Sequence, residues 1–139
     1  VVSVILLIFL AFSLRTNQKE AVESYEVESF IQSFLQYTTD CKDNLEALSV
    51  QRLISSCNNN EKCVDGRKSC DVLNSTLSEI ASESWPIGTD RPVKGYGLII
   101  NSDNRSVIEL KEGQETVNSK GSIQPLPKGV EIIFTAYYG

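Results

Sequence analysis

The sequence predicts an α+β fold in which a long N-terminal α-helix forms a stalk and carries a small disulfide-bonded head of two short helices and an antiparallel β-sheet. Three observations predict it. The first forty residues contain no Gly or Pro, four cysteines lie close together in the middle of the chain, and β-branched and aromatic residues prevail after residue 92. We therefore divide the 139 residues into the long helix (1–40), a cysteine-rich helical cap (41–86) and a small antiparallel β-sheet head (87–139).

The long helix is predicted from the spacing of its apolar residues. In its second half, five of them follow the i, i+3, i+4, i+7 and i+8 pattern of an amphipathic helix: Val27, Phe30, Ile31, Phe34 and Leu35. This face is expected to pack on the head of the same chain. Residues 1–14 (VVSVILLIFLAFSL) are instead apolar on all sides and carry no charge, so they are expected to need another apolar partner.

The apolar segment 1–14 is expected to be too short to span a membrane by itself. As a helix it would cover roughly 21 Å, against the ~30 Å of a bilayer's hydrocarbon core. It also lacks the basic start and the small-residue cleavage site of a signal peptide. We therefore expect it to pack against other copies of the chain. Its apolar residues make up the predicted assembly interface: Val1, Val2, Val4, Ile5, Leu6, Leu7, Ile8, Phe9, Leu10 and Phe12.

Two short helices are predicted in the cap. Ser49 can cap the first, VQRLISSC, and Ser69 can cap the second, which Trp85-Pro86 ends because proline cannot continue a helical hydrogen-bond ladder. Trp85 is the only tryptophan of the chain. We interpret it as a core residue at the junction of helix and sheet, with a binding role as the alternative.

The cysteines Cys41, Cys57, Cys63 and Cys70 are predicted to form two disulfides. A zinc site is the alternative, but it favours close pairs such as C-x2-C, whereas 15, 5 and 6 residues separate these cysteines and the chain has no histidine. Four cysteines allow three pairings, of which we favour Cys57–Cys63 with Cys41–Cys70. Two disulfides indicate an oxidising, extracellular compartment.

The last third of the chain is predicted to be a small antiparallel sheet laid against the long helix. Three segments have the β-branched and aromatic content and the alternation of strands: 93–101 (VKGYGLIIN), 105–111 (RSVIELK) and 130–138 (VEIIFTAYY). Ser102-Asp103-Asn104 indicates a hairpin turn between the first two. Pro125 and Pro127 restrict any strand between residues 115 and 129 to a sheet edge.

Two sequons are candidates for N-glycosylation, Asn74-Ser75-Thr76 and Asn104-Arg105-Ser106. Asn104 is the better candidate because it lies in a turn-like stretch that should be exposed. Asn74 is expected on a helix, where the triplet is more readily explained by chance. Both agree with an extracellular location.

Composition and motifs exclude several classes of function. The net charge of −5 disfavours the phosphate contacts that dominate nucleic-acid binding, so no nucleic acid is expected as a partner. The sequence contains no nucleophile motif, no phosphate-binding loop and no histidine to act as a base. The acidic stretch 40–46 does not match a calcium loop, and the glutamates between residues 20 and 28 read as a solvated helix face. We therefore expect no enzymatic activity, no cofactor and no metal.

The opening VVSVILLIFLAF, the helical pattern after it and the disulfide-bonded, β-containing remainder resemble a subunit of the archaeal type IV pilin and archaellin superfamily. Ile5 stands where bacterial pilins carry an acidic residue, an absence that archaeal pilins and archaellins tolerate. The segments TTDCKDN, VQRLISSC, CVDGRKSC and SWPIGTDRPVKGY also look like those of uncharacterised surface proteins of small symbiotic archaea.

This resemblance implies a structural role. In such filaments the apolar helix ends pack in a central bundle, and the heads form the outside. The chain would be inserted in the membrane before assembly, and would then bind copies of itself in a cell-surface filament for adhesion or attachment, with a host-cell surface as one target. The alternative is a membrane-anchored extracellular binding module whose N-terminus only tethers the head, and a secreted or membrane-bound enzyme is a third interpretation.

Overall fold

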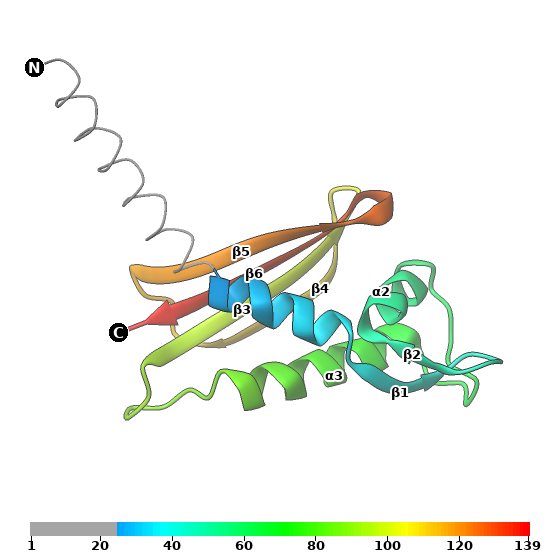
Figure 1. Ribbon diagram of the computed structural model, residues 1–139, viewed down its shortest axis with the longest axis horizontal. Helices are drawn as coiled ribbons and strands as arrows, with labels where there is room; N and C mark the ends of the chain where they lie inside the picture. Colours follow the sequence, from blue (N-terminus) through cyan, green and yellow to red (C-terminus); the bar gives the residue numbers. More distant parts are fainter. Residues whose placement is uncertain (1–24) are drawn as a thin grey trace, which may run out of the picture.

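A computed structural model describes residues 25–139 of the chain. A helix that includes residues 25–35 is followed by β1 (Thr38–Lys42), β2 (Ala47–Ser49), α2 (Val50–Asn58) and α3 (Ser69–Ser84). The second half contains β3 (Val93–Ser102), β4 (Arg105–Gly113), β5 (Asn118–Leu126), the short 3-10 helix η1 (Pro127–Gly129) and β6 (Val130–Tyr138). The described residues form an α+β domain with two sheets (Figure 1).

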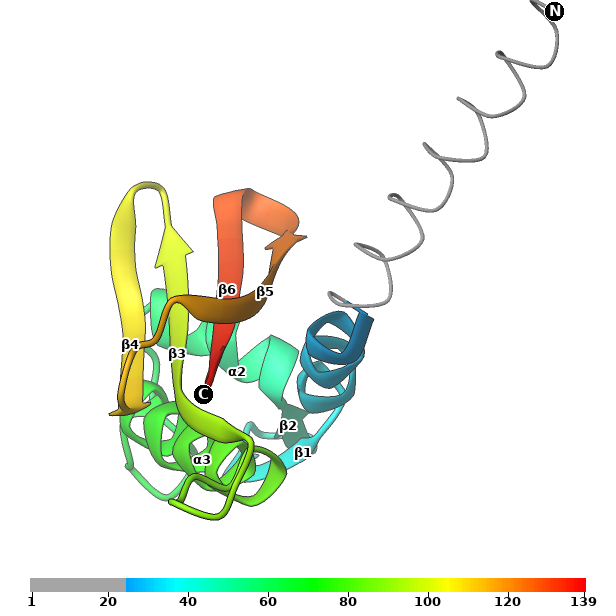
Figure 2. The ribbon, with the colours of Figure 1, turned by 90° about the vertical axis from the view of Figure 1, so that its left-hand side faces the viewer.

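The larger sheet has four antiparallel strands in the order β4-β3-β6-β5. In the part of the chain that the structure describes, the helices lie on one face of this sheet, which curves around them (Figures 1 and 2). Asp103 and Asn104, both with positive φ, form the two-residue turn between β3 and β4, as hairpin twist requires. The predicted hairpin turn is confirmed, and β5, which contains Pro125, is an edge strand as expected.

The inner face of the sheet is built by alternate residues of its two central strands. Leu98 lies beside Phe134, and Ile100 lies beside Ile132, with none of the four more than 1% exposed. They belong to one core together with apolar residues of the helices, which include Val27, Ile31 and Phe34 from residues 25–35, and Leu73, Leu77 and Ala81 from α3. The core therefore joins the first helix, the cap and the sheet.

Trp85 lies directly after α3 and is a core residue, as predicted. Its ring packs against Phe30 and Phe134 with centroid distances of 5.6 and 5.3 Å, and only 9% of the residue is exposed. The indole N–H has no hydrogen-bond partner among the described residues. Three elements meet at this aromatic cluster: the first helix, the end of α3 and β6.

The two predicted helix caps have different outcomes. Ser49 caps α2, because its hydroxyl accepts a hydrogen bond from the Arg52 backbone N–H at 3.3 Å. The prediction for Ser69 is wrong: Lys68 occupies the cap position, and Ser69 is the first residue of α3. Its buried hydroxyl donates to the Glu61 carbonyl at 2.6 Å instead, which ties the start of α3 to the loop before it.

The predicted fold class is wrong. The described residues show no long N-terminal helix, and they contain three short α-helices and two sheets where we expected a head of two helices and one sheet. The helix ends at residue 35. Residues 38–40, which we expected to be helical, belong to β1, which pairs with β2 in a second sheet. The Thr39 hydroxyl donates a hydrogen bond to the Leu48 carbonyl across the hairpin at 2.8 Å. Tertiary contacts of this kind favour a strand here over a continued helix. Residues 1–24, and with them the first part of the predicted stalk, lie outside the described residues.

Candidate functional site at the disulfide-bonded cap

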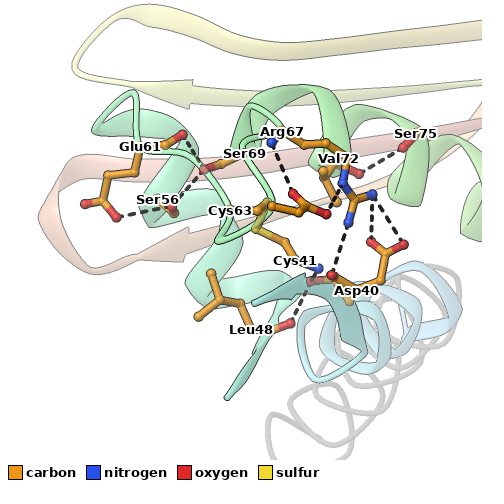
Figure 3. The surroundings of a disulfide bond; sticks show 12 residues. Asp40, Cys41, Leu48, Ser56, Glu61, Cys63, Arg67, Ser69, Val72 and Ser75 are labelled. Carbon is orange, nitrogen blue, oxygen red and sulfur yellow. Dashed lines mark hydrogen bonds and ion pairs between the residues drawn. A yellow bond between two sulfur atoms is a disulfide. The ribbon is translucent and has the colours of Figure 1, made fainter. Parts of the chain in front are cut away.

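The cap contains both disulfides, so the prediction of two bridges is confirmed. Figure 3 shows the surroundings of one of them, Cys41–Cys63. The favoured pairing is wrong: Cys41 bonds Cys63, and Cys57 bonds Cys70. The cause is β1, which brings Cys41 beside the turn that contains Cys63, with 5.2 Å between their Cα atoms. The end of α2 meets the start of α3 in the same way, with 4.6 Å between the Cα atoms of the second pair.

An arginine fixes the turn of residues 63–67 against β1. The Arg67 Nε lies 2.7 Å from Asp65 Oδ2, while the other guanidinium nitrogens contact the Asp40 carboxylate at 3.4 Å and its carbonyl at 3.2 Å (Figure 3). The backbone N–H of Arg67, together with its guanidinium, lowers the pKa of Asp65 below its usual range. These exposed ion pairs are individually weak, but they add to the disulfide in holding the turn in place.

A buried polar cluster links α2 to α3. The hydroxyls of Ser56 and Ser69 lie 2.9 Å apart, and Ser56 also reaches the Glu61 carboxylate at 3.3 Å. A serine nucleophile needs a neighbouring base that is itself oriented toward it, most often a histidine, and the chain has none. The cluster satisfies buried hydroxyls, and its arrangement offers a structural link rather than a reaction.

The turn between β1 and β2 presents an exposed leucine on a rigid backbone. Asp43 Oδ1 accepts hydrogen bonds from the backbone N–H groups of Leu45 and Glu46, both at 2.8 Å. These bonds, that of Glu46 first, lower the pKa of Asp43 below its usual range. Leu45 itself is 93% exposed. Val64, in the adjacent turn, is 64% exposed and donates its backbone N–H to the Lys42 carbonyl. We call Leu45 and Val64 the apolar tip.

A cleft of about 220 Å³ lies between α2 and the turn that joins β5 to β6. Its apolar lining comes from Ile54, Leu126, Pro127 and Val130, and its charged lining comes from Arg52 and Lys128. No acidic side chain lines it among the described residues. We call it the α2 cleft. A cleft with an apolar and cationic lining suits an apolar side chain that is flanked by carboxylates.

The two sequons lie in different surroundings. Asn104 is exposed in the β3–β4 turn, and the following two residues are exposed at the start of an edge strand. Asn74 is exposed on α3, but Thr76 is half-buried and the Ser75 hydroxyl bonds the Val72 carbonyl within the helix. The structure thus presents only Asn104-Arg105-Ser106 as a triplet whose three residues are all exposed and outside a helix, and attachment of a glycan stays a prediction.

The segment SWPIGTDRPVKGY, on which part of the resemblance rested, has a structural explanation. Lys94 Nζ donates to the carbonyls of Gly88, Thr89 and Arg91 at 3.3, 3.2 and 2.7 Å, so one ammonium group organises the loop before β3. Gly95 has no space for a side chain, because a Cβ there would overlap the backbone of Gln114. These residues fold the chain, and none of them forms a site.

The predicted assembly interface, the residues between Val1 and Phe12 named above, lies outside the described residues. Within residues 25–139, no helix is long and apolar enough to cross a membrane. The same part of the chain has no group of three or more cysteine or carboxylate side chains that could hold a metal ion.

Comparison of the chain with protein families, characterised proteins and solved structures finds no match. Any function assigned to the candidate site must therefore be argued from the geometry of its residues. Sequence reasoning missed both the apolar tip and the α2 cleft. One signal for the tip was present: Leu45 is an isolated apolar residue in the polar stretch KDNLE, where a helix or strand pattern gives it no buried face.

Proposed function

We propose that this chain is the structural subunit of an extracellular, type IV pilus-like filament that assembles through its apolar N-terminal segment and serves adhesion or attachment. The observation that carries the proposal is the contrast between the two parts of the chain. The head has its own core, to which the helix of residues 25–35 contributes Val27, Ile31 and Phe34. Residues 1–14 are fourteen further residues without charge, mostly large and apolar, in a chain that is otherwise acidic.

The apolar segment is sufficient in size to hold a polymer together. Seven of its residues are large and apolar between positions 5 and 12: Ile5, Leu6, Leu7, Ile8, Phe9, Leu10 and Phe12. At roughly 1.5–3 kcal/mol for each buried side chain, they would contribute about 10–20 kcal/mol per subunit before ordering costs are subtracted. Packing of this segment among copies would also remove it from water, while the disulfide-bonded head stays outside.

Electron microscopy of filaments sheared from producing cells, with mass spectrometry of their subunits, tests the proposal. Regular fibres that contain this chain are the expected result. Leu7→Asp and Phe9→Asp should abolish fibres while both disulfides still form, because a carboxylate cannot be buried unpaired in the assembled segment. Val117→Asp is the matched control, since Val117 is 99% exposed in the head and its replacement should leave assembly intact.

Two results would overturn the proposal. Intact fibres from Leu7→Asp would remove the assembly role of the segment. Recovery of the chain only as single particles in the membrane fraction would favour the alternative, a membrane-anchored extracellular binding module.

A further inference from the structure

We propose that the heads also contact one another directly, with the apolar tip of one copy seated in the α2 cleft of the next. The inference rests on the proposed filament and names a second contact within it. It commits to a second copy of this chain as the occupant of the cleft. Four properties of the described residues support it: rigidity of the tip, shape and lining of the cleft, charge, and the position of the two surfaces on one molecule.

The apolar tip is preorganised. The Asp43 carboxylate holds the backbone N–H groups of Leu45 and Glu46, and the Cys41–Cys63 bridge joins the hairpin to the turn that carries Val64. A binding segment that is already rigid loses little conformational entropy when it docks. Single exposed apolar residues are ordinary on protein surfaces, but two on adjacent, covalently joined turns form a protrusion that can enter a pocket.

The α2 cleft has the complementary character. Ile54 and Val130 are buried in the domain and form part of its wall, while Pro127 and Lys128 belong to the exposed turn at its edge. Lys128 adopts a left-handed backbone, with φ of 66°, a conformation that glycine or asparagine adopts more readily than lysine.

Charge on the two surfaces is opposite. Asp43 and Glu46 flank Leu45, whereas Arg52 and Lys128 line the cleft. Glu46 already pairs with Arg52 of its own chain at 2.5 Å. Among the described residues, neither Asp43 nor Lys128 forms an ion pair, although the charge of Arg52 helps to lower the pKa of Asp43. Docking of Leu45 in the cleft would allow these two groups to pair across the contact.

The tip and the cleft are different surfaces of the same molecule. Leu45 belongs to the β1–β2 turn, whereas the cleft lies between α2 and the turn that joins β5 to β6, and the two surfaces meet at Arg52, which lines the cleft and pairs with Glu46. A contact between unlike surfaces leaves a free tip and a free cleft after each addition, so it propagates along a polymer instead of closing into a dimer. This is the type of contact that a filament of identical subunits needs.

A charge-and-shape exchange in the full-length chain tests the contact, with the critical concentration for fibre assembly as the readout. Leu45→Lys should raise that concentration roughly 10- to 100-fold, because an apolar anchor is lost and a cation is placed among cations. Lys128→Asp should raise it as well. The double variant should assemble better than either single variant, since the new lysine would enter a cleft whose lining contains the new aspartate. Val117→Asp, the matched control, should stay within about twofold of the parent chain.

Zero-length carbodiimide cross-linking of fibres made from mixed ¹⁴N- and ¹⁵N-labelled copies locates the contact directly. An isotopically mixed Asp43–Lys128 peptide is expected. Wild-type fibres that lack this cross-link, or single variants that assemble like the control, overturn the docking and leave the filament proposal standing. A wild-type chain that forms no fibres overturns both.

Discussion

Removal of one disulfide provides a quantitative check on the cap. In the double variant Cys57→Ala/Cys70→Ala, the bridge between α2 and α3 is lost while Cys41–Cys63 remains. The bridge closes a ring over a sequence separation of 13 residues, and Cys41–Cys63 closes one of 22. The chain-entropy relation gives about 2.9 kcal/mol for the first and about 3.4 kcal/mol for the second at 25 °C.

The loss of free energy should be seen as a lower unfolding temperature. For a domain of this size, a loss of about 3 kcal/mol corresponds to a fall of roughly 10–15 °C in Tm. The two rings overlap between residues 57 and 63, so each bridge restricts the loop that the other one closes. Removal of both bridges should therefore cost more than the sum of the two single losses, but less than the sum of the two values above. Cys57 is 2% exposed, and the small void left by its sulfur adds to the entropic loss.

Urea denaturation followed by the fluorescence of Trp85 measures this loss. Trp85 is the only tryptophan and lies in the aromatic cluster of the core, so its emission reports unfolding of the domain. The reduced parent protein is the control. A free energy of unfolding within about 0.5 kcal/mol of the parent value, for an oxidised protein that lacks one bridge, would refute the reasoning.

A tryptic map under non-reducing conditions checks the pairing itself. Lysine or arginine lies between every two successive cysteines, at Lys42, Lys62 and Arg67 among other positions, so each cysteine falls in a separate peptide. The expected cross-linked pairs join Cys41 to Cys63, and Cys57 to Cys70. A peptide pair that joins Cys57 to Cys63 would contradict the structure.

Three further predictions concern the core, the sequon and the effect of acid. Phe134→Ala should lower the free energy of unfolding by about 3–5 kcal/mol, because Phe134 is fully buried, and a loss below 1 kcal/mol in urea titration would contradict its central position. In chain purified from producing cells, Asn104→Gln should remove a glycan mass and Asn74→Gln should not; the reverse result in intact-mass spectrometry would contradict the assignment. The pKa values of Asp43 and Asp65 are lowered in the folded state, so their stabilising contribution is present above the unfolded pKa and is lost as pH falls below about 4. Asp43→Asn/Asp65→Asn should therefore show a shallower loss of stability from pH 5 to 2, and parallel curves for variant and parent would disagree.

The elements with strong local signals were predictable from the sequence. Three strands of the large sheet, β3, β4 and β6, follow from β-branched and aromatic residues in alternation, and the β3–β4 turn follows from Asp103 and Asn104, residue types that tolerate positive φ. α2 follows from Ser49 and an apolar stripe, and Trp85 was correctly placed in the core. For the strands, the β3–β4 turn and α2, the residues that determine the structure are neighbours in sequence.

The cap was less predictable because distant residues determine it. β1 and β2 have five and three residues, too few for a clear alternation, and their pairing depends on the disulfide to the turn at Cys63 and on the Thr39 hydroxyl. Residues 38–40 were expected to be helical, so the strand that brings Cys41 beside Cys63 was not predicted, and the favoured cysteine pairing was wrong too. The α2 cleft joins residues separated by about seventy positions, and no sequence pattern predicts such a meeting.

The overlapping disulfides have a consequence for proteolysis. Every peptide bond between Cys41 and Cys70 lies inside at least one covalent ring. Hydrolysis of a single bond in that stretch, at the exposed Asp65-Gly66 turn for example, opens a ring but releases no fragment. A molecule cut there keeps its full mass until its disulfides are reduced. The cap, which exposes the most turns, is therefore also the region where a protease removes the least.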